Sequence, residues 1–244
     1  MDFTLSEEQQ ALVNVTRQFA QKELADYADK IEKTGLPAPR ILLQRFAEMG
    51  FLGVNLPAHY GGGGMSHLDA VLVLEELAKV SVAAAFPVFE SCFGPALAIA
   101  HYGPEQMRSS VLPDVCSGNM IVAVSMSEPQ AGTALTDLKT ELVPNGKSFV
   151  LRGTKRWCSG AGHADAYVVY CRMSDAPGAK GIGAVLVHDG VEGFTFGAPE
   201  EHMGFRGIPS ADMYFDDVNV SADQIIVPAG GFKQLMEAFD LERC

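Results

Sequence analysis

The sequence predicts an α+β protein: a helical N-terminal domain, then a small β-barrel domain, then the start of a second helical domain. Up to about residue 119, apolar residues recur at the three- and four-residue spacing of amphipathic helices. After Met120, short β-branched and aromatic runs alternate with turn residues, which is typical of a small barrel or sandwich. A last helical pattern begins at Phe232, after two glycines. We therefore expect domains over 1–119, 120–228 and 229–244.

The first helix is marked by its N-terminal cap. Ser6 and Gln9 form a capping-box pattern, and Leu12, Val15 and Phe19 follow at helical spacing. Gly50 ends the second helical pattern, because glycine readily adopts the left-handed conformation that closes a helix. The further helices are expected at 41–49, 66–78, 93–100 and 105–111.

The middle of the chain has the pattern of short strands. Asn145-Gly146 is a strong signal for a tight hairpin turn. Strands are expected at 121–124, 148–151, 167–170, 184–187, 194–196 and 213–215.

Composition restricts the functional classes. Of 244 residues, 48% are hydrophobic and 20% charged, enough for a sizeable core. The net charge of −12 argues against non-specific nucleic-acid binding, which needs a basic surface. The five cysteines and six histidines are scattered without metal-ligand spacing, so we expect no metal site and reduced thiols of a cytoplasmic protein. We also expect no signal peptide and no apolar run of transmembrane length.

Two segments have a pattern that points to cofactor binding. Val124–Thr133 reads V-S-M-S-E-P-Q-A-G-T, leaves a strand and turns, exposing backbone N–H groups and small hydroxyls. Lys155–Ser159 reads K-R-W-C-S. In a regular strand residues i and i+2 share a face, so Trp157 and Ser159 would present a ring and a hydroxyl together. A planar, polar-edged cofactor such as a flavin suits that surface.

The same segments resemble a known family. S-E-P-Q-A-G-T is similar to the T-E-P-x-A-G-S signature of the acyl-CoA dehydrogenases, and K-R-W-C-S is similar to their K-x-W-I-T. The segments at 49–64, 203–207 and 215–220 continue the match in the family's order. The match covers the first two domains of the family and only the opening turns of the third, four-helix domain. Three residues depart from the pattern: Thr133 replaces Ser, Ala134 replaces Asp, and Cys158 replaces Ile or Val.

The resemblance implies an FAD site. It places Trp157 against the flavin ring, with Ser127 and Ser159 hydrogen-bonded to the ring edge. Taken singly, these hydroxyls are equally typical of ordinary turns and strands, and Trp157 of a protein core. The residues implied for cofactor binding are Val124, Met126, Ser127, Gly132, Thr133, Trp157, Cys158 and Ser159.

Glu242, in F-D-L-E-R-C, is the candidate catalytic base. Removing a proton alpha to a thioester carbonyl needs a carboxylate in a dry pocket with a raised pKa. In the isovaleryl-CoA and long-chain branches of the family the base directly precedes a helix arginine, as Glu242 precedes Arg243. The resemblance also places Thr133, Asp240 and Arg243 at the substrate. Alternatively, Glu242 and Arg243 are solvated helix charges and the base lies in the third domain.

The implied reaction is dehydrogenation of an acyl-CoA to a trans-2-enoyl-CoA, with hydride transfer to flavin N5. An electron-transfer flavoprotein would accept the electrons, and the protein would be a homotetramer or dimer. The alternatives are another flavoenzyme of the same scaffold, such as an oxidase, and a non-catalytic or split-assembly partner. The sequence does not identify the acyl chain of the substrate. Phe86, Phe89 and Phe93 fall near the acyl site that the resemblance implies, and they favour an apolar pocket.

The apolar side of the last helix raises a separate expectation. Phe232, Leu235, Met236 and Phe239 need a partner surface, and the sequence after them contains only a few residues. We therefore expect this face to be exposed and to promote self-association.

Overall fold

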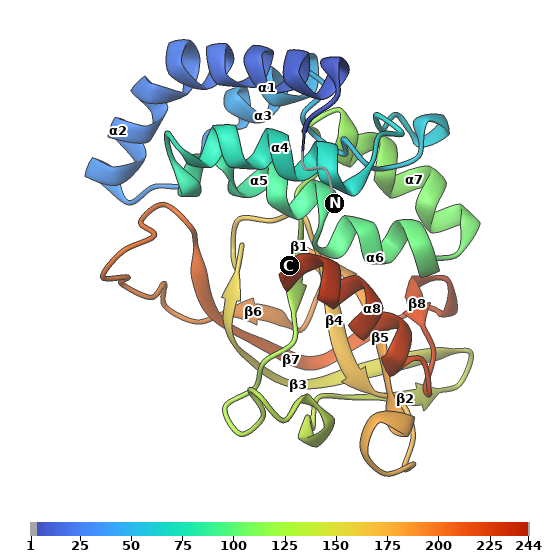
Figure 1. Cartoon of the computed structure of the whole chain (residues 1–244). Coiled ribbons are helices and arrows are strands. Elements are labelled where there is room, and N and C mark those ends of the chain that lie inside the picture. The colour runs from blue at the N-terminus through green and yellow to red at the C-terminus, as the bar shows by residue number, and fades with distance from the viewer. Residues whose placement is uncertain (1–3, 244) are drawn as a thin grey trace.

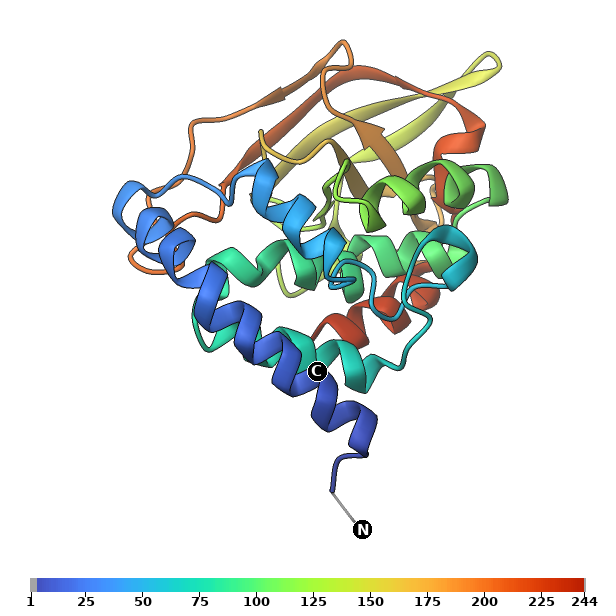
Figure 2. The same cartoon turned by 90° about the horizontal axis from the view of Figure 1, so that it is seen from above.

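The structure is a computed structural model that describes residues 4–243. The α-helices before the first strand form one layer, the strands form the other, and the final helix α8 lies beside α6 (Figure 1; Figure 2 shows the layers from above). The helices are α1 (Glu7–Phe19), α2 (Ala25–Thr34), α3 (Arg40–Glu48), α4 (His67–Ala78), α5 (Val82–Cys92), α6 (Pro95–Tyr102), α7 (Glu105–Cys116) and α8 (Phe232–Arg243). The strands are β1 (Val122–Ser125), β2 (Glu141–Asn145), β3 (Ser148–Ser159), β4 (Ala166–Arg172), β5 (Ile182–His188), β6 (Phe194–Phe196), β7 (Ser210–Val220) and β8 (Ile225–Val227).

The helix starts follow the predicted caps. The capping box of Ser6 and Gln9 is present at α1, and Ser66 caps α4 in the same way. The α1 helix continues through a short π-helical segment, Ala20–Leu24, into α2. Its buried residues include Phe19, whereas Val15 is 47% exposed and faces outwards. The predicted apolar stripe was therefore wrong at Val15.

The strands form one eight-stranded sheet. Its order is β6-β7-β3-β2-β4-β5-β8, and β1 pairs with β4 in parallel. The Asn145-Gly146 hairpin is confirmed, since Asn145 pairs with Ser148 across it. The path runs from β6 at one end to β8 at the other, so the predicted barrel takes the form of a twisted sheet (Figure 1).

Helices and sheet share a hydrophobic core. Phe46, Val73 and Val88 from the helical layer belong to the same buried cluster as Val169 and Phe215 from the sheet. Burial of these side chains stabilises each layer only when the other is in place, because neither could remove its apolar face from water alone. The shared core thus fixes α5 over the strands that carry the two sequence motifs.

The α8 helix packs back on the rest of the chain. Leu235 and Ala238 are buried, and the other apolar side chains of α8 are half-buried against a core cluster that includes residues of α6, β5 and β8. The Tyr102 hydroxyl also donates a 2.9 Å hydrogen bond to Glu237. The expectation of an exposed apolar face was therefore wrong, because α6 and the sheet edge supply the partner surface.

One part of the helical layer is strongly apolar. Residues 82–102, which contain α5 and α6, form a 21-residue stretch with a mean hydropathy of 1.6, long and apolar enough to cross a membrane by length and composition. This corrects the expectation that no apolar run reaches such a length. However, 78% of the most apolar 18-residue segment of this stretch is buried inside the protein, against neighbouring helices and β1. The stretch has the burial of a core helix.

Candidate functional site

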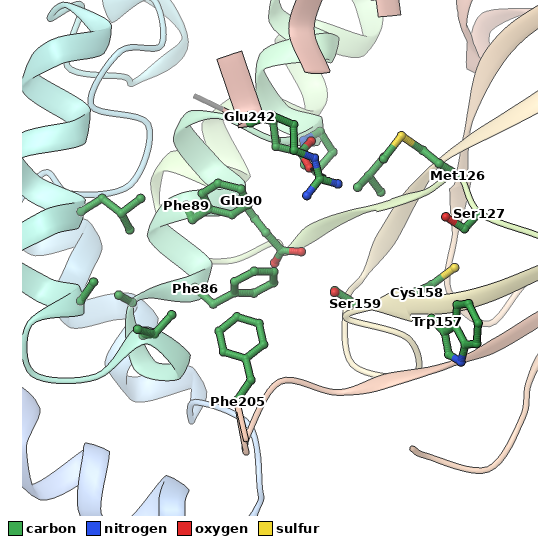
Figure 3. A pocket seen from close by; sticks show the side chains of 18 of the residues that line it. Phe86, Phe89, Glu90, Met126, Ser127, Trp157, Cys158, Ser159, Phe205 and Glu242 are labelled. Carbon is green, nitrogen blue, oxygen red and sulfur yellow. Dashed lines mark ion pairs between the residues drawn. The ribbon is translucent and has the colours of Figure 1, made fainter. Parts of the chain in front are cut away.

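A cavity of about 440 Å³ lies between the helices and the sheet. Its sheet wall is formed by the end of β1, the turn after it and the end of β3, and its helical wall by α4, α5 and the end of α8 (Figure 3). The sheet wall includes Val124, Met126, Ser127, Trp157, Cys158 and Ser159. The structure thus brings six of the eight predicted cofactor residues to one surface.

A buried ion pair joins the two sequence motifs. The Lys155 ammonium donates to Glu128 and to the backbone oxygen of Met126, each at 2.9 Å, and both charged side chains are at most 1% exposed. Next to this pair, the backbone N–H of Arg156 donates to the oxygen of Ser127 at 2.8 Å. Because Glu128 and Lys155 belong to different segments, the pair fixes the turn after β1 against β3.

The Glu128 carboxylate is fully partnered. The backbone N–H groups of Lys139 and Thr140 donate to it at 2.7 and 2.9 Å, and the Gln130 amide donates at 2.7 Å. Burial alone would raise the pKa of Glu128, but the Lys155 charge and these donors hold that pKa below its usual range. Glu128 is therefore ionised and serves to position the sheet wall.

Trp157 lies at an irregularity of β3. Its φ is +56°, and the pairing of β3 with β7 shifts register between Lys155 and Cys158. The regular alternation assumed from the sequence was therefore wrong here, although Trp157 and Ser159 still line the same cavity. Trp157 is 63% exposed, which excludes the core role, and the Arg156 guanidinium lies 4.9 Å from its ring centre. The aromatic face of Trp157 is thus accessible at the cavity and not buried in the core.

Several polar side-chain groups of the sheet wall lack a hydrogen-bond partner. Within residues 4–243 the hydroxyls of Ser127 and Ser159 make no hydrogen bond, and the buried Arg156 Nε makes none either, its ion-pair partner Asp212 being 3.9 Å away. Buried polar groups are normally paired, so such groups beside a cavity indicate a missing ligand. Two hydroxyls, a guanidinium and an indole face match the edge and face of a planar, polar-edged group such as a flavin.

Three predicted residues lie away from the cavity. Gly132 and Thr133 are exposed in the loop after the turn, and Asp240 is exposed on α8. None of them lines the 440 Å³ cavity. The chain turns at Pro129 and Gln130, and of the motif only Val124, Met126 and Ser127 line the cavity.

Glu242 enters the cavity from the last turn of α8 (Figure 3). Its side chain is only 10% exposed, whereas that of Arg243 is 60% exposed, 3.5 Å away. Burial raises the pKa of the Glu242 carboxyl, and the Arg243 charge opposes this only in part. The Arg243 guanidinium also lies 4.5 Å from the Phe239 ring centre, and Arg243 lines the cavity beside Glu242. A carboxyl of this kind is suited to take up a proton.

A second carboxyl in the cavity was missed from the sequence. Glu90 of α5 is 7% exposed, and Figure 3 shows its carboxyl aimed into the cavity from the helical wall. Burial, and then the nearby charge of Glu242, raise the pKa of Glu90 to about 8. The signal was present: Glu90 is the sole Asp, Glu, Lys or Arg between Lys79 and Glu105.

Aromatic rings surround Glu90. Phe86 packs on Phe89 at 5.5 Å and meets Phe205 edge-on at 5.6 Å, and all three line the cavity. Phe93, grouped with them in the sequence, is buried and does not line it. The helical end of the cavity is therefore apolar apart from Glu90, Glu242 and Arg243.

Comparison with known proteins assigns the family. Sequence profiles of the acyl-CoA dehydrogenase N-terminal domain and middle domain match residues 6–119 and 123–218. The chain belongs to the acyl-CoA dehydrogenase family. These two profiles match the helical layer up to the end of α7 and the sheet from β1 to β7.

Relatives of this family member cover almost all of it. Acryloyl-CoA reductase (NADH) of Anaerotignum propionicum is 33% identical over 98% of the chain, and mitochondrial isovaleryl-CoA dehydrogenase of Pongo abelii is 31% identical over 98%. The chain spans only 61% and 57% of the length of these two proteins. Their activities belong to the longer proteins.

Solved structures share the fold. A chain in the structure of the electron transferring flavoprotein of Acidaminococcus fermentans, solved towards a mechanism of flavin-based electron bifurcation, superimposes with a TM-score of 0.93. It is 32% identical, and the match covers 100% of this family member and 64% of that chain. Among residues 4–243 no group of three His, Cys, Asp or Glu side chains is arranged to hold a metal ion.

Proposed function

We propose that this chain is the flavin-binding and acyl-binding part of an FAD-dependent acyl-CoA dehydrogenase, which converts an acyl thioester to a trans-2-enoyl thioester. One observation carries the proposal. A single cavity brings together the unpaired hydroxyls of Ser127 and Ser159, the exposed ring of Trp157 and the buried carboxyl of Glu242. A ring-binding surface and a base thus face one space.

FAD, when bound, would supply the acceptor for a hydride. The residues proposed to hold it are Ser127 and Ser159 at its edge and Trp157 at its face, with Val124, Met126 and Cys158 in the same wall. Gly132 and Thr133, exposed beyond the turn, are proposed for the part of the cofactor outside the cavity. The buried ion pair of Glu128 and Lys155 keeps these groups in place.

Glu242 is proposed as the base that takes the α-proton of the thioester. Its carboxylate oxygens face the cavity, and burial raises its pKa, so an ionised Glu242 has a strong tendency to bind a proton. The apolar helical wall excludes water around it, which keeps the carboxylate reactive. Taking up the proton also removes a buried negative charge.

The coenzyme A part of the bound substrate is proposed to extend out of the cavity past the end of α8. Arg243 is 60% exposed there, and Asp240 and Thr133 are exposed outside the cavity, where the polar part of the substrate would lie. An electron-transfer flavoprotein as electron acceptor, a homotetramer or dimer, and a cytoplasmic location are proposed with this function. The domain boundaries at residues 119 and 228 stay proposals as well.

Glu242→Gln tests this function in the FAD-loaded protein. The substitution keeps size and hydrogen bonding but removes the proton acceptor, so flavin bleaching by an acyl-CoA should slow by about 10²- to 10⁴-fold. The flavin spectrum should stay unchanged. The matched control is Glu237→Gln on the same helix, which is exposed and should bleach at the normal rate. Normal bleaching in Glu242→Gln would place the base elsewhere.

A further inference from the structure

Glu90 is a buried carboxyl without a partner. Within residues 4–243 it forms no hydrogen bond and no ion pair, although it is only 7% exposed. Other buried acids of the chain are paired: Glu76 with Arg17 at 2.9 Å, and Glu128 with Lys155 at 2.9 Å. A buried polar group that lacks a partner is costly, so its presence at a cavity calls for a ligand that pairs with it.

Glu90 lies where the helical wall of the cavity approaches the sheet wall. Its Oε1 lies 3.8 Å from where a Cβ would stand on Gly160, directly after Ser159, so the carboxyl reaches from the helical wall to the sheet. Phe86 and Phe205 lie beside it in Figure 3, and Glu242 lies at another part of the same cavity. An acyl chain of suitable length that enters past Glu242 and runs along the phenylalanine rings can place its end beside Glu90.

The surroundings of Glu90 favour its uncharged, protonated form. Burial, followed by the negative charge of Glu242, raises the pKa of Glu90 to about 8. A protonated carboxyl offers one O–H donor and further acceptor capacity. The charged and titratable groups that face it across the cavity or lie behind it are Glu242, Arg243, Arg156, His163 and Tyr167.

We propose that Glu90 selects acyl thioesters whose acyl group carries an uncharged hydrogen-bonding group, a hydroxyl, carbonyl or amide, at its far end. This inference rests on the proposed function. A plain alkyl chain would displace water from Glu90 and leave the carboxyl unpaired. A hydroxyl or carbonyl would pair with it. A carboxylate would bring another negative charge into the cavity of Glu242, and an ammonium would require Glu90 to ionise.

The test compares matched thioesters that do not react. Trans-2-enoyl-CoA esters of increasing chain length, each with and without a terminal hydroxyl, are titrated into the FAD-loaded protein by calorimetry. At the length that reaches Glu90, the hydroxylated ester should bind about 5- to 100-fold more tightly than the plain one. Carboxylate- and ammonium-ended esters of that length should bind more weakly than the hydroxylated one.

Two variants assign the preference to Glu90. Glu90→Gln keeps a donor and an acceptor and should keep the preference, whereas Glu90→Leu should abolish or reverse it. Phe89→Leu, in the same wall, should weaken the binding of the hydroxylated and the plain ester by the same factor. Equal binding of the two esters to the wild type, or tightest binding of a charged one, overturns the inference while leaving the proposed function intact. If neither FAD nor any ester binds, the proposed function fails and this inference fails with it.

Discussion

Two buried glutamates, one in the helical wall of the cavity and one behind the sheet wall, have opposite surroundings. Glu128, on the sheet side, is 3% exposed and accepts hydrogen bonds from Lys155, Gln130 and two backbone N–H groups. Glu90, on the helical side, is 7% exposed and forms no such bond within residues 4–243. The pKa of Glu128 is accordingly lowered, and that of Glu90 is raised to about 8.

The difference in hydrogen bonding distinguishes a carboxylate that positions the structure from a carboxyl that is available for chemistry. A fully paired carboxylate is held in one place and has no capacity left for a ligand, so Glu128 serves the geometry of the sheet wall. An unpaired carboxyl costs stability but is available to a ligand or a proton. Glu242 is paired with Arg243 at 3.5 Å but resembles Glu90 in that burial raises its pKa. The helical wall thus carries the carboxyls that can react, and the buried pair behind the sheet wall fixes the geometry of that wall.

The largest effect is expected from breaking the buried pair. Lys155→Met leaves the Glu128 carboxylate buried without its cation and should lower the free energy of unfolding by about 3–5 kcal/mol. Urea unfolding measures this. Adding Glu128→Gln to Lys155→Met removes the uncompensated charge and should recover much of the loss. A loss below about 1 kcal/mol in the single variant would contradict the positioning role.

The next effect concerns the pH dependence of stability. The folded-state pKa of Glu90 is about 8, well above the ordinary 4.5, so its contribution to stability is fully present below pH 4.5 and is lost as the pH rises to about 8. Across that window this group should lower the unfolding free energy by about 1.4 kcal/mol per pH unit.

The matched variant isolates the contribution of Glu90. Glu90→Gln cannot ionise, so the difference in unfolding free energy between variant and wild type should grow steadily from pH 5 to about 8 and then level off. Urea unfolding at several pH values gives this difference. A difference that does not change with pH would show that Glu90 ionises normally and has a partner.

The smallest effect on stability is expected at Trp157. Because the ring is 63% exposed, Trp157→Leu should change the free energy of unfolding by no more than about 0.5 kcal/mol. The same substitution should weaken FAD binding, since it removes the aromatic face of the sheet wall. Thermal unfolding without cofactor and equilibrium dialysis with FAD measure the two effects. A large loss of stability would give Trp157 a structural role instead.

The sequence predicted features that depend on local pattern. The capping box at Ser6, the Asn145-Gly146 hairpin and the helix from Phe232 were all correct, because each is determined by a few neighbouring residues. The α5 helix was missed. It is apolar on all sides and contains Pro87, so it lacks the periodicity of an amphipathic helix and carries a residue that normally ends one.

The candidate site was predicted in part for the same reason. The two motifs pointed to Ser127, Trp157 and Ser159, which do line one cavity. The ion pair that joins the motifs was not predicted, because its residues are 27 positions apart. The bulge at Trp157 arises from pairing with β7, more than 50 positions along the chain, which no local pattern reveals.

The central claim is that a flavin binds on the sheet wall against Trp157. This is the single tryptophan of the chain, and it is exposed, so its fluorescence reports directly on that surface. Titration with FAD should quench the emission in a saturable way at one FAD per chain. Free N-acetyltryptophanamide, titrated in parallel, corrects for absorption by FAD. Emission that follows the free amino acid throughout the titration would contradict the account.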